Sequence, residues 1–249
     1  MNKIPKIVHY IWFGNNEKSE LIQKCQISNS LYLNGWDVNE WTESNYEINS
    51  CAYAIEAYSK KYYAFVSDYV RFDILYKYGG VYLDTDVELL KEIPEEFLNN
   101  EGFTGVESND KIAPGLIFAC KAKNPIVMEI LKDYKNDRFI LPDGELNKKT
   151  VCERVTDIFK KHGFVENGKI QDIEGIKVMS SEYFCAYDFI TKEFDKTKNT
   201  VSIHHYSGTW VSKKQKLFNQ FKMILKRVVG KKAFVKIVML KRKFLGIRS

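Results

Sequence analysis

The chain has 249 residues, of which 45% are hydrophobic and 14% aromatic. This composition excludes a mainly disordered chain, and the length suits one α/β domain with a short appendage. Charge is divided unevenly: residues 213–249 hold thirteen Lys or Arg and no acidic residue, so residues 1–212 carry 25 basic and 32 acidic side chains, a net of −7. The sequence therefore predicts an acidic domain over 1–212 and a basic tail over 213–249, without the basic surface that would bind nucleic acid along the whole chain.

The cysteines and the apolar segments exclude other classes. Five cysteines, at positions 25, 51, 120, 152 and 185, are widely spaced without a CxxC pair, which indicates neither a zinc cage nor a disulfide framework. The first residues lack a small-residue cleavage site, and no run of 18 or more apolar residues occurs, so we expect neither a signal peptide nor a membrane span.

The chain opens with a predicted β-α-β unit. Residues 6–13 (KIVHYIWF) are β-branched and aromatic and stop at Gly14-Asn15-Asn16, which is typical of a buried strand that ends in a turn. Residues 20–33 favour a helix, and the alternating residues 36–42 favour a second strand. Such a unit begins a parallel sheet of the nucleotide-binding type.

A helix is predicted over 61–78, because aromatic residues recur there at helical spacing before Gly79-Gly80. The apolar strand 81–83 follows and runs into Asp84-Thr85-Asp86. The remaining predicted strands are 103–106, 116–120 and 201–205, and the remaining predicted helices are 125–134 and 151–161.

The two aspartates form the first candidate site. Side chains two residues apart in a strand point to the same side, so Asp84 and Asp86 could offer hard oxygen ligands to magnesium or manganese at the carboxyl end of a strand. A bare Asp-x-Asp triplet is also typical of an Asx turn or a helix cap.

Three segments extend this pattern. The run FVSDYVRFDILYKYGGVYLDTD over 65–86 resembles the DXD sugar-binding signature of glycosyltransferase family 32, which is shared with the glucosylating domains of large clostridial toxins. Residues 4–12 (IPKIVHYIW) and 204–210 (HHYSGTW) are similar to the first strand and the C-terminal His/Trp element of that family. The resemblance is closest to small bacterial members associated with capsular or other surface polysaccharides.

The resemblance implies a GT-A fold and transfer of a sugar from a nucleotide donor, usually UDP-linked, with retention at the anomeric carbon. It implies that Asp86 binds a divalent manganese or magnesium ion directly. Asp84 would contact the donor sugar or ribose, and the metal through water. Asp68 and Arg71, one turn apart on a helix, would hold donor sugar hydroxyls. The alternative for that pair is an ordinary surface salt bridge.

The resemblance also implies that aromatic residues contact the nucleotide part of the donor. Trp12 would stack on the uracil base, the alternative being core packing, and Tyr82 would lie near the donor or in the core. Near the C-terminus, His205 is preferred as the metal or phosphate ligand, and His204, which faces the other way, is expected to be structural. Trp210 would cover the departing phosphate with Ser207 nearby.

The pattern departs from the family at Gly208-Thr209, where many relatives have Ser before Trp, so the phosphate contact there is left open. No nucleophile or catalytic base is identified, and a front-face and a covalent mechanism both stay open. Residues 110–118 and 142–144 could border the acceptor or could simply be turns.

The tail offers two interpretations. Leu217, Phe221, Ile224 and Val228 share one helical face among basic residues, which is typical of a helix on an anionic membrane surface. The same tail could instead dock on the acidic domain.

The sequence therefore favours a metal-dependent retaining glycosyltransferase that uses a UDP-sugar and a glycan or lipid-linked oligosaccharide acceptor. We expect it in the cytoplasm, on the inner face of a bacterial membrane. The alternatives are a nucleotide-sugar-binding protein without turnover and an effector that glycosylates a protein.

Overall fold

The computed structural model describes residues 3–188 and 193–207, together with Gly230 and Ala233. The predicted tail over 213–249 lies outside the described residues apart from those two positions, and so does Trp210. In the described part of the chain, no helix is long and apolar enough to cross a membrane.

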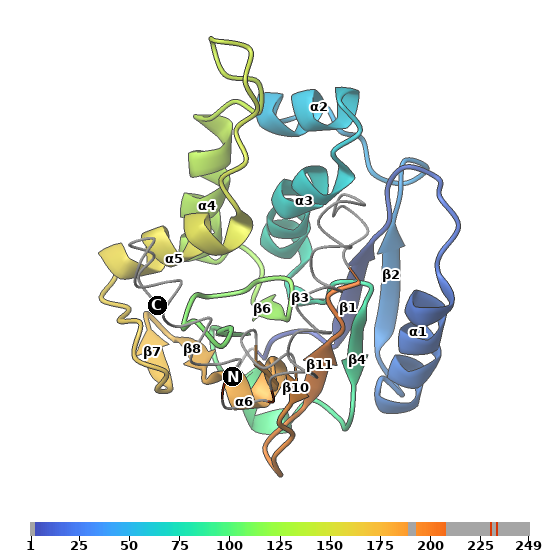
Figure 1. The fold of residues 1–249 in the computed structure, drawn as a ribbon, viewed down its shortest axis with the longest axis vertical. Helices are drawn as coiled ribbons and strands as arrows, with labels where there is room; N and C mark the ends of the chain where they lie inside the picture. The colour runs from blue at the N-terminus through green and yellow to red at the C-terminus, as the bar shows by residue number, and fades with distance from the viewer. Residues whose placement is uncertain (1–2, 189–192, 208–229, 231–232, 234–249) are drawn as a thin grey trace.

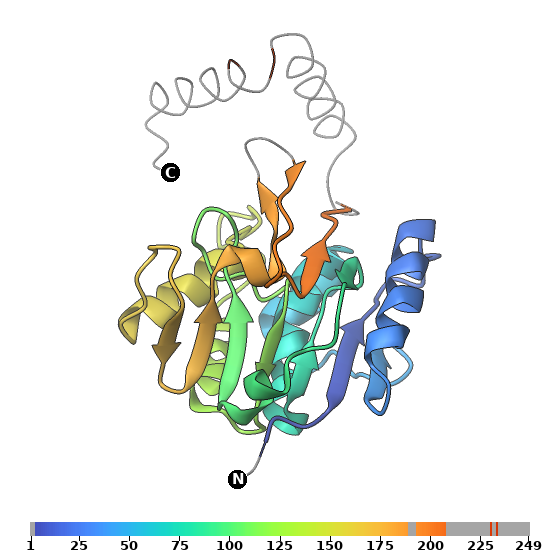
Figure 2. The ribbon, with the colours of Figure 1, turned by 90° about the horizontal axis from the view of Figure 1, so that it is seen from below.

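A seven-stranded mixed sheet forms the centre of the molecule (Figures 1 and 2). In spatial order its strands are β2 (Asp37–Trp41), β1 (Ile7–Ile11), β3 (Gly80–Tyr82), β6 (Phe118–Cys120), β5 (Gly102–Gly105), β8 (Ile176–Met179) and β7 (Gln171–Ile173). β2, β1 and β3 are parallel, as are β5 and β8, whereas β6 and β7 are antiparallel to their neighbours. The α/β class predicted from the sequence is confirmed.

The predicted β-α-β opening is also confirmed. Helix α1 (Glu20–Tyr32) connects β1 to β2, and the two strands pair in parallel with Ile7 opposite Asp37. Ser19 caps α1 by accepting a hydrogen bond from the Ile22 amide. A crossover helix of this kind is the usual connection between parallel neighbours.

Helix α3 (Tyr63–Tyr78) leads the chain directly into β3. It ends at Gly79, whose φ of 66° lies in the left-handed region that favours glycine. A Cβ atom at this position would also lie 2.7 Å from the Ala122 backbone nitrogen. The sharp reversal brings the carboxyl end of β3 close to the side chains of α3.

Helices cover both faces of the sheet (Figure 1). One face carries α3 with α2 (Ala52–Ser59), α4 (Pro125–Lys135) and α5 (Val151–Lys161), and the other carries α1, the 3₁₀ helix η1 (Glu95–Asn99) and α6 (Ser181–Phe184). Buried residues alternate between the two cores: Tyr82 and Phe118 pack toward α3, and Val81 and Ala119 pack on the opposite side.

A small antiparallel sheet brings the end of the chain back to β3. Strand β4 (Val87–Leu89) pairs with β11 (Ser202–His204), with His204 opposite Val87. A second pair, β9 (Tyr187–Asp188) and β10 (Glu193–Phe194), extends beyond the edge of the central sheet at which β1 ends (Figure 2). Segments far apart in the sequence therefore meet beside the carboxyl end of β3.

One feature of the predicted site differs in its local structure. The sequence predicts Asp84 and Asp86 at a strand end, pointing the same way because of the pleat. In the structure they occupy a tight turn, closed by a 3.0 Å hydrogen bond from the Val87 amide to the Asp84 carbonyl. The elements that the sequence analysis did not predict are α2, η1, α6, β4, β7, β8, β9 and β10.

Candidate active site

The Asp84-Thr85-Asp86 turn lies at the carboxyl end of β3, the edge at which open α/β sheets bind ligands. The Tyr82 hydroxyl donates a 2.7 Å hydrogen bond to Asp84 Oδ1. The Asp84 amide donates to the Gly115 carbonyl at 3.0 Å. Tyr82 is buried, so it is both a core residue and a support for the first aspartate.

Asp68 and Arg71 face this turn from α3. Arg71 Nη2 lies 2.6 Å from Asp68 Oδ1 and 3.5 Å from Asp84 Oδ1, and the guanidinium carbon lies 4.6 Å from the centre of the Tyr82 ring. Arg71 is only 3% exposed, so the pair is a buried bridge to the aspartate turn, and the surface salt bridge is excluded. Burial raises the pKa of Asp68 to about 6, although Arg71 acts in the opposite direction.

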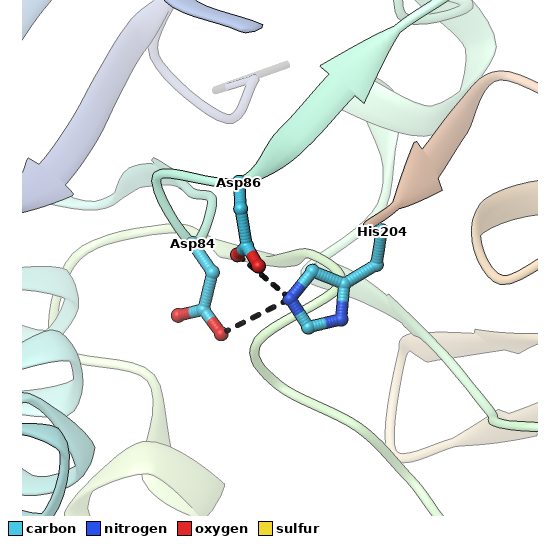
Figure 3. A group of neighbouring side chains, drawn as sticks. All are labelled: Asp84, Asp86 and His204. Atoms are coloured by element: carbon cyan, nitrogen blue, oxygen red, sulfur yellow. Dashed lines mark hydrogen bonds and ion pairs between the residues drawn. The ribbon is translucent and has the colours of Figure 1, made fainter. Parts of the chain in front are cut away.

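Asp86 is joined to the far end of the chain. His204 Nε2 lies 2.9 Å from Asp86 Oδ1 and 3.8 Å from Asp84 Oδ2 (Figure 3). The Ser207 amide donates a 2.7 Å hydrogen bond to Asp86 Oδ2. Burial opposes ionisation of Asp86, but the hydrogen bonds and the charge of His204 outweigh it and lower the pKa of this carboxyl below its usual range. Burial likewise opposes protonation of His204, and Asp86 reverses this and raises its pKa.

Asp84, Asp86 and His204 fit a divalent metal. One ligand atom from each residue lies within 4.8 Å of the other two, and the three side chains converge from the β3–β4 turn and from β11 (Figure 3). Two carboxylates and one imidazole are suitable ligands for manganese, and the carboxylates alone suit magnesium. His204 Nε2, rather than Nδ1, faces the aspartates, so this nitrogen is the candidate ligand.

The structure brings His204, rather than His205, to the aspartates. His205, preferred from the sequence, points away from the aspartates and pairs through Nε2 with Glu88 Oε2 at 2.7 Å. The two rings therefore have different partners, and the ring beside the aspartates is that of His204, not that of the preferred His205. Pairing with β4 places His204 opposite Val87, next to Asp86, and this register is not visible in the sequence.

On the nucleotide side, Trp12 follows β1 and is half-buried, with its indole nitrogen donating to the Asn16 carbonyl at 2.8 Å. Stacking on a base stays a prediction. A nearby carboxylate, Glu43, follows β2: its Oε1 accepts from the Gly14 amide at 2.6 Å and from the Tyr58 hydroxyl at 3.2 Å. Among the described residues, Glu43 Oε2 is buried without a hydrogen-bond partner.

The remaining residues predicted from the sequence lie partly at the site and partly outside the described residues. Ser207 lies at the site, although its contact with Asp86 is made by the backbone amide. Residues 110–118 reach the site through Gly115, whereas a role in acceptor binding stays a prediction for that loop and for 142–144. Trp210 and Gly208-Thr209 lie outside the described residues.

Three residues near the site were not predicted from the sequence: Glu43, Gly115 and Glu107, whose Oε1 accepts a 3.1 Å hydrogen bond from the hydroxyl of Tyr206, close to His204. The two glutamates follow the carboxyl ends of β2 and β5, just as Asp84 follows β3, so the edge rule used for the aspartates could have found them. Gly115 carried no signal of its own, because its role depends on a contact with Asp84 from another part of the chain.

The fold and the site together define an α/β protein with a carboxylate and imidazole cluster at the carboxyl end of its parallel strands. Residues 6–104 match the family described as the glycosyltransferase sugar-binding region containing the DXD motif. Residues 6–104 are therefore similar to this glycosyltransferase region, as the resemblance predicted, and the α/β class of the fold is confirmed. The GT-A type of fold stays a prediction.

A relative and two solved structures are also similar. Inositol phosphoceramide mannosyltransferase 1 of Schizosaccharomyces pombe is 32% identical over 94 residues, which are 35% of this chain and 29% of that protein. The chain thus spans less than a third of the length of this relative. The structure of PaToxG glycosyltransferase aligns with a TM-score of 0.48 at 18% identity over 64% of this chain and 69% of the other. That of a glycosyltransferase involved in glycosylation of the major capsid of PBCV-1 aligns with a TM-score of 0.48 at 13% identity over 82% and 95%.

Proposed function

We propose that this chain is a metal-dependent glycosyltransferase that moves a sugar from a nucleoside diphosphate donor to a glycan or lipid-linked acceptor. The observation that carries the proposal is the convergence of Asp84, Asp86 and His204 within 4.8 Å at the carboxyl end of β3. The family match over 6–104 supports it, since the matched segment contains both aspartates together with Asp68 and Arg71.

Each group has a role in this proposal. A manganese or magnesium ion held by Asp84, Asp86 and His204 would neutralise the charge that develops on the departing diphosphate. Arg71 is permanently cationic and Asp68 accepts hydrogen bonds, so this buried pair suits the hydroxyls of the donor sugar. Trp12 offers a flat ring for the base, and Tyr82 keeps Asp84 in place.

The finer points come from the sequence resemblance and from one relative. We propose a UDP-linked donor, retention at the anomeric carbon and a role in bacterial surface polysaccharide synthesis. The relative's name describes mannosyl transfer to a phosphoinositol lipid, which favours a lipid-linked acceptor and makes GDP-mannose a donor worth testing. The boundary at residue 212 and attachment of the tail 213–249 to an anionic cytoplasmic membrane face are further parts of the proposal.

The test is a donor screen on the full chain. UDP-glucose, UDP-galactose, their N-acetyl forms and GDP-mannose are incubated with manganese, with magnesium or with EDTA, and nucleoside diphosphate release is measured together with thermal shift. We expect one donor to be turned over only with metal, and Asp86→Asn to lose at least about a hundredfold of that rate.

A matched control makes the same chemical change elsewhere. Asp37 is exposed at the amino end of β2, at the opposite edge of the sheet from the site. The Asp37→Asn variant should therefore turn over the donor at the rate of the unmodified protein. Metal-dependent stabilisation by a donor without any turnover would favour the non-catalytic binding protein. Turnover that EDTA and Asp86→Asn leave unchanged would contradict the site assignment.

A further inference from the structure

The segment that carries His204 also contains a residue in an unusual backbone conformation. Tyr206 has a φ of 49°, in the left-handed region that bulky residues rarely adopt. It lies between His204, whose ring contacts Asp86, and Ser207, whose amide also contacts Asp86. Such a conformation persists only where the surroundings determine it strongly, so the contacts of Tyr206 are informative.

The ring of His204 depends on Tyr206 for its orientation. A histidine that binds a metal through one nitrogen is usually oriented by a hydrogen bond from the other. Within the described residues, His204 Nδ1 is buried and has no hydrogen-bond partner. What lies against the imidazole is the Tyr206 ring, with the two ring centres 4.1 Å apart. Packing therefore takes the place of the usual hydrogen bond.

Tyr206 is in turn held by Glu107. Its hydroxyl donates a 3.1 Å hydrogen bond to Glu107 Oε1, lies 3.4 Å from Cys185 Sγ, and its ring centre is 5.2 Å from that of Tyr187. These partners come from the end of β5 and from the segment after α6, so the tyrosine is supported by parts of the chain other than β11, which it follows.

The backbone of Glu107 is held in place by hydrogen bonds. It begins a tight loop in which its amide donates to the Lys111 carbonyl at 2.9 Å and its carbonyl accepts from the Asp110 amide at 2.9 Å. The residues on either side, Val106 and Ile112, form a β-bridge across the loop. The carboxylate is thus fixed to the central sheet through β5.

We infer that Glu107 and Tyr206 are positioning residues that hold the His204 imidazole in the geometry for binding a divalent metal. The chain of contacts runs from β5 through the Glu107 carboxylate and the Tyr206 hydroxyl to the face of the imidazole, and ends at Asp86. This inference rests on the proposed function. It adds Glu107, which lies outside the segments of the sequence resemblance, and it gives a role to Tyr206, for which the resemblance implied none.

The test measures manganese affinity directly, by the electron paramagnetic resonance signal of free Mn²⁺ in the presence of UDP. Tyr206→Phe keeps the ring and removes only the hydroxyl, and Glu107→Ala removes the acceptor. Each is expected to weaken manganese binding about tenfold, in the range seen when groups that orient metal ligands are removed. The double variant should be no weaker than either single variant, because both break the same contact.

Glu107→Gln separates position from charge. Its amide oxygen still accepts the hydrogen bond from Tyr206, so we expect manganese affinity close to that of the unmodified protein. Affinity as low as that of Glu107→Ala would overturn the inference, because the carboxylate would then act through its charge. Unchanged affinity in both Tyr206→Phe and Glu107→Ala would also overturn it.

Two controls keep the results distinct. Glu92→Gln changes an exposed glutamate elsewhere and should leave manganese affinity unchanged. Thermal unfolding in EDTA should show that all variants are folded. EDTA removes the metal, so the variants are compared without any stabilisation by bound manganese. If the unmodified protein binds no manganese in the presence of UDP, the proposed function fails; if it does and the two substitutions have no effect, only the positioning inference fails.

Discussion

At the scale of single residues, the site depends on how Asp84 is held. The side chain accepts from Tyr82, lies near Arg71, and its backbone amide donates to Gly115. Space beside the carboxylate is limited: a Cβ atom at Gly115 would lie 3.0 Å from Asp84 Cγ and 3.5 Å from Arg71 Nη1. Gly115 is therefore a glycine because of the site and not because of its backbone angle.

This contact gives the first prediction. Gly115→Ala should displace the Asp84 carboxylate and reduce donor turnover by about a hundredfold, because a catalytic group moved by about 1 Å loses that much. The unfolding midpoint should change little. Gly163→Ala is the contrasting control, because Gly163 has a φ of 94° and an added Cβ would meet no atom within 4 Å. This variant should lose about 1–2 kcal/mol of unfolding free energy and keep its full donor turnover. Full turnover in Gly115→Ala would contradict this account of Asp84.

Several residues predicted from the sequence lie together in the structure. Sequence reasoning singled out Asp84 and Asp86 from their spacing at a strand end, and the family resemblance added Asp68 and Arg71. It preferred His205, whereas the structure brings His204 to the aspartates, because the register between β4 and β11 is decided by pairing across most of the chain.

At the scale of elements, α4, α5 and the β7–β8 turn are joined by one histidine. His162 follows α5, and its Nε2 and Nδ1 lie 2.7 Å from Glu129 on α4 and 2.7 Å from Glu174 in the turn. Both nitrogens can donate only in the charged imidazolium. The hydrogen bonds to the two glutamates accordingly raise the pKa of His162.

The pH dependence of stability follows from this contact. Because the pKa is raised in the folded state, the contribution of His162 is fully present below its unfolded pKa of about 6.5 and is lost as pH rises through the folded pKa. The difference in unfolding free energy between the unmodified protein and His162→Gln should therefore be larger at about pH 6 than at about pH 9. Denaturant unfolding at the two pH values measures it, and a difference that is constant or grows with pH would refute the contact.

Elements with a strong local pattern could be predicted from the sequence. The helix over 151–161 was expected with the limits that the structure has, since its apolar residues recur at helical spacing and Thr150 and Glu153 form a capping box. The strands that were missed have two to four residues and are held by long-range pairing, as β7 is by β8. Windows so short carry almost no periodic signal.

At the scale of the whole molecule, the site is assembled from both ends of the described chain. The segment 6–104, which matches the family model, contains both aspartates together with Asp68 and Arg71, whereas His204 and Ser207 come from the end of the described range 193–207. The β4–β11 pairing joins these parts, so the folded domain is a condition for the complete cluster. The division into an acidic body and a basic tail was visible in the sequence, since it needs only charge counting.

The central claim is that Asp84, Asp86 and His204 bind a divalent metal together with a nucleoside diphosphate. The most direct measurement compares manganese binding in the presence of UDP for the unmodified protein, His204→Ala and His205→Ala. We predict that His204→Ala weakens binding at least about tenfold and that His205→Ala, whose ring pairs with Glu88, binds as the unmodified protein does. The reverse order, or equal binding by all three, would contradict the claim.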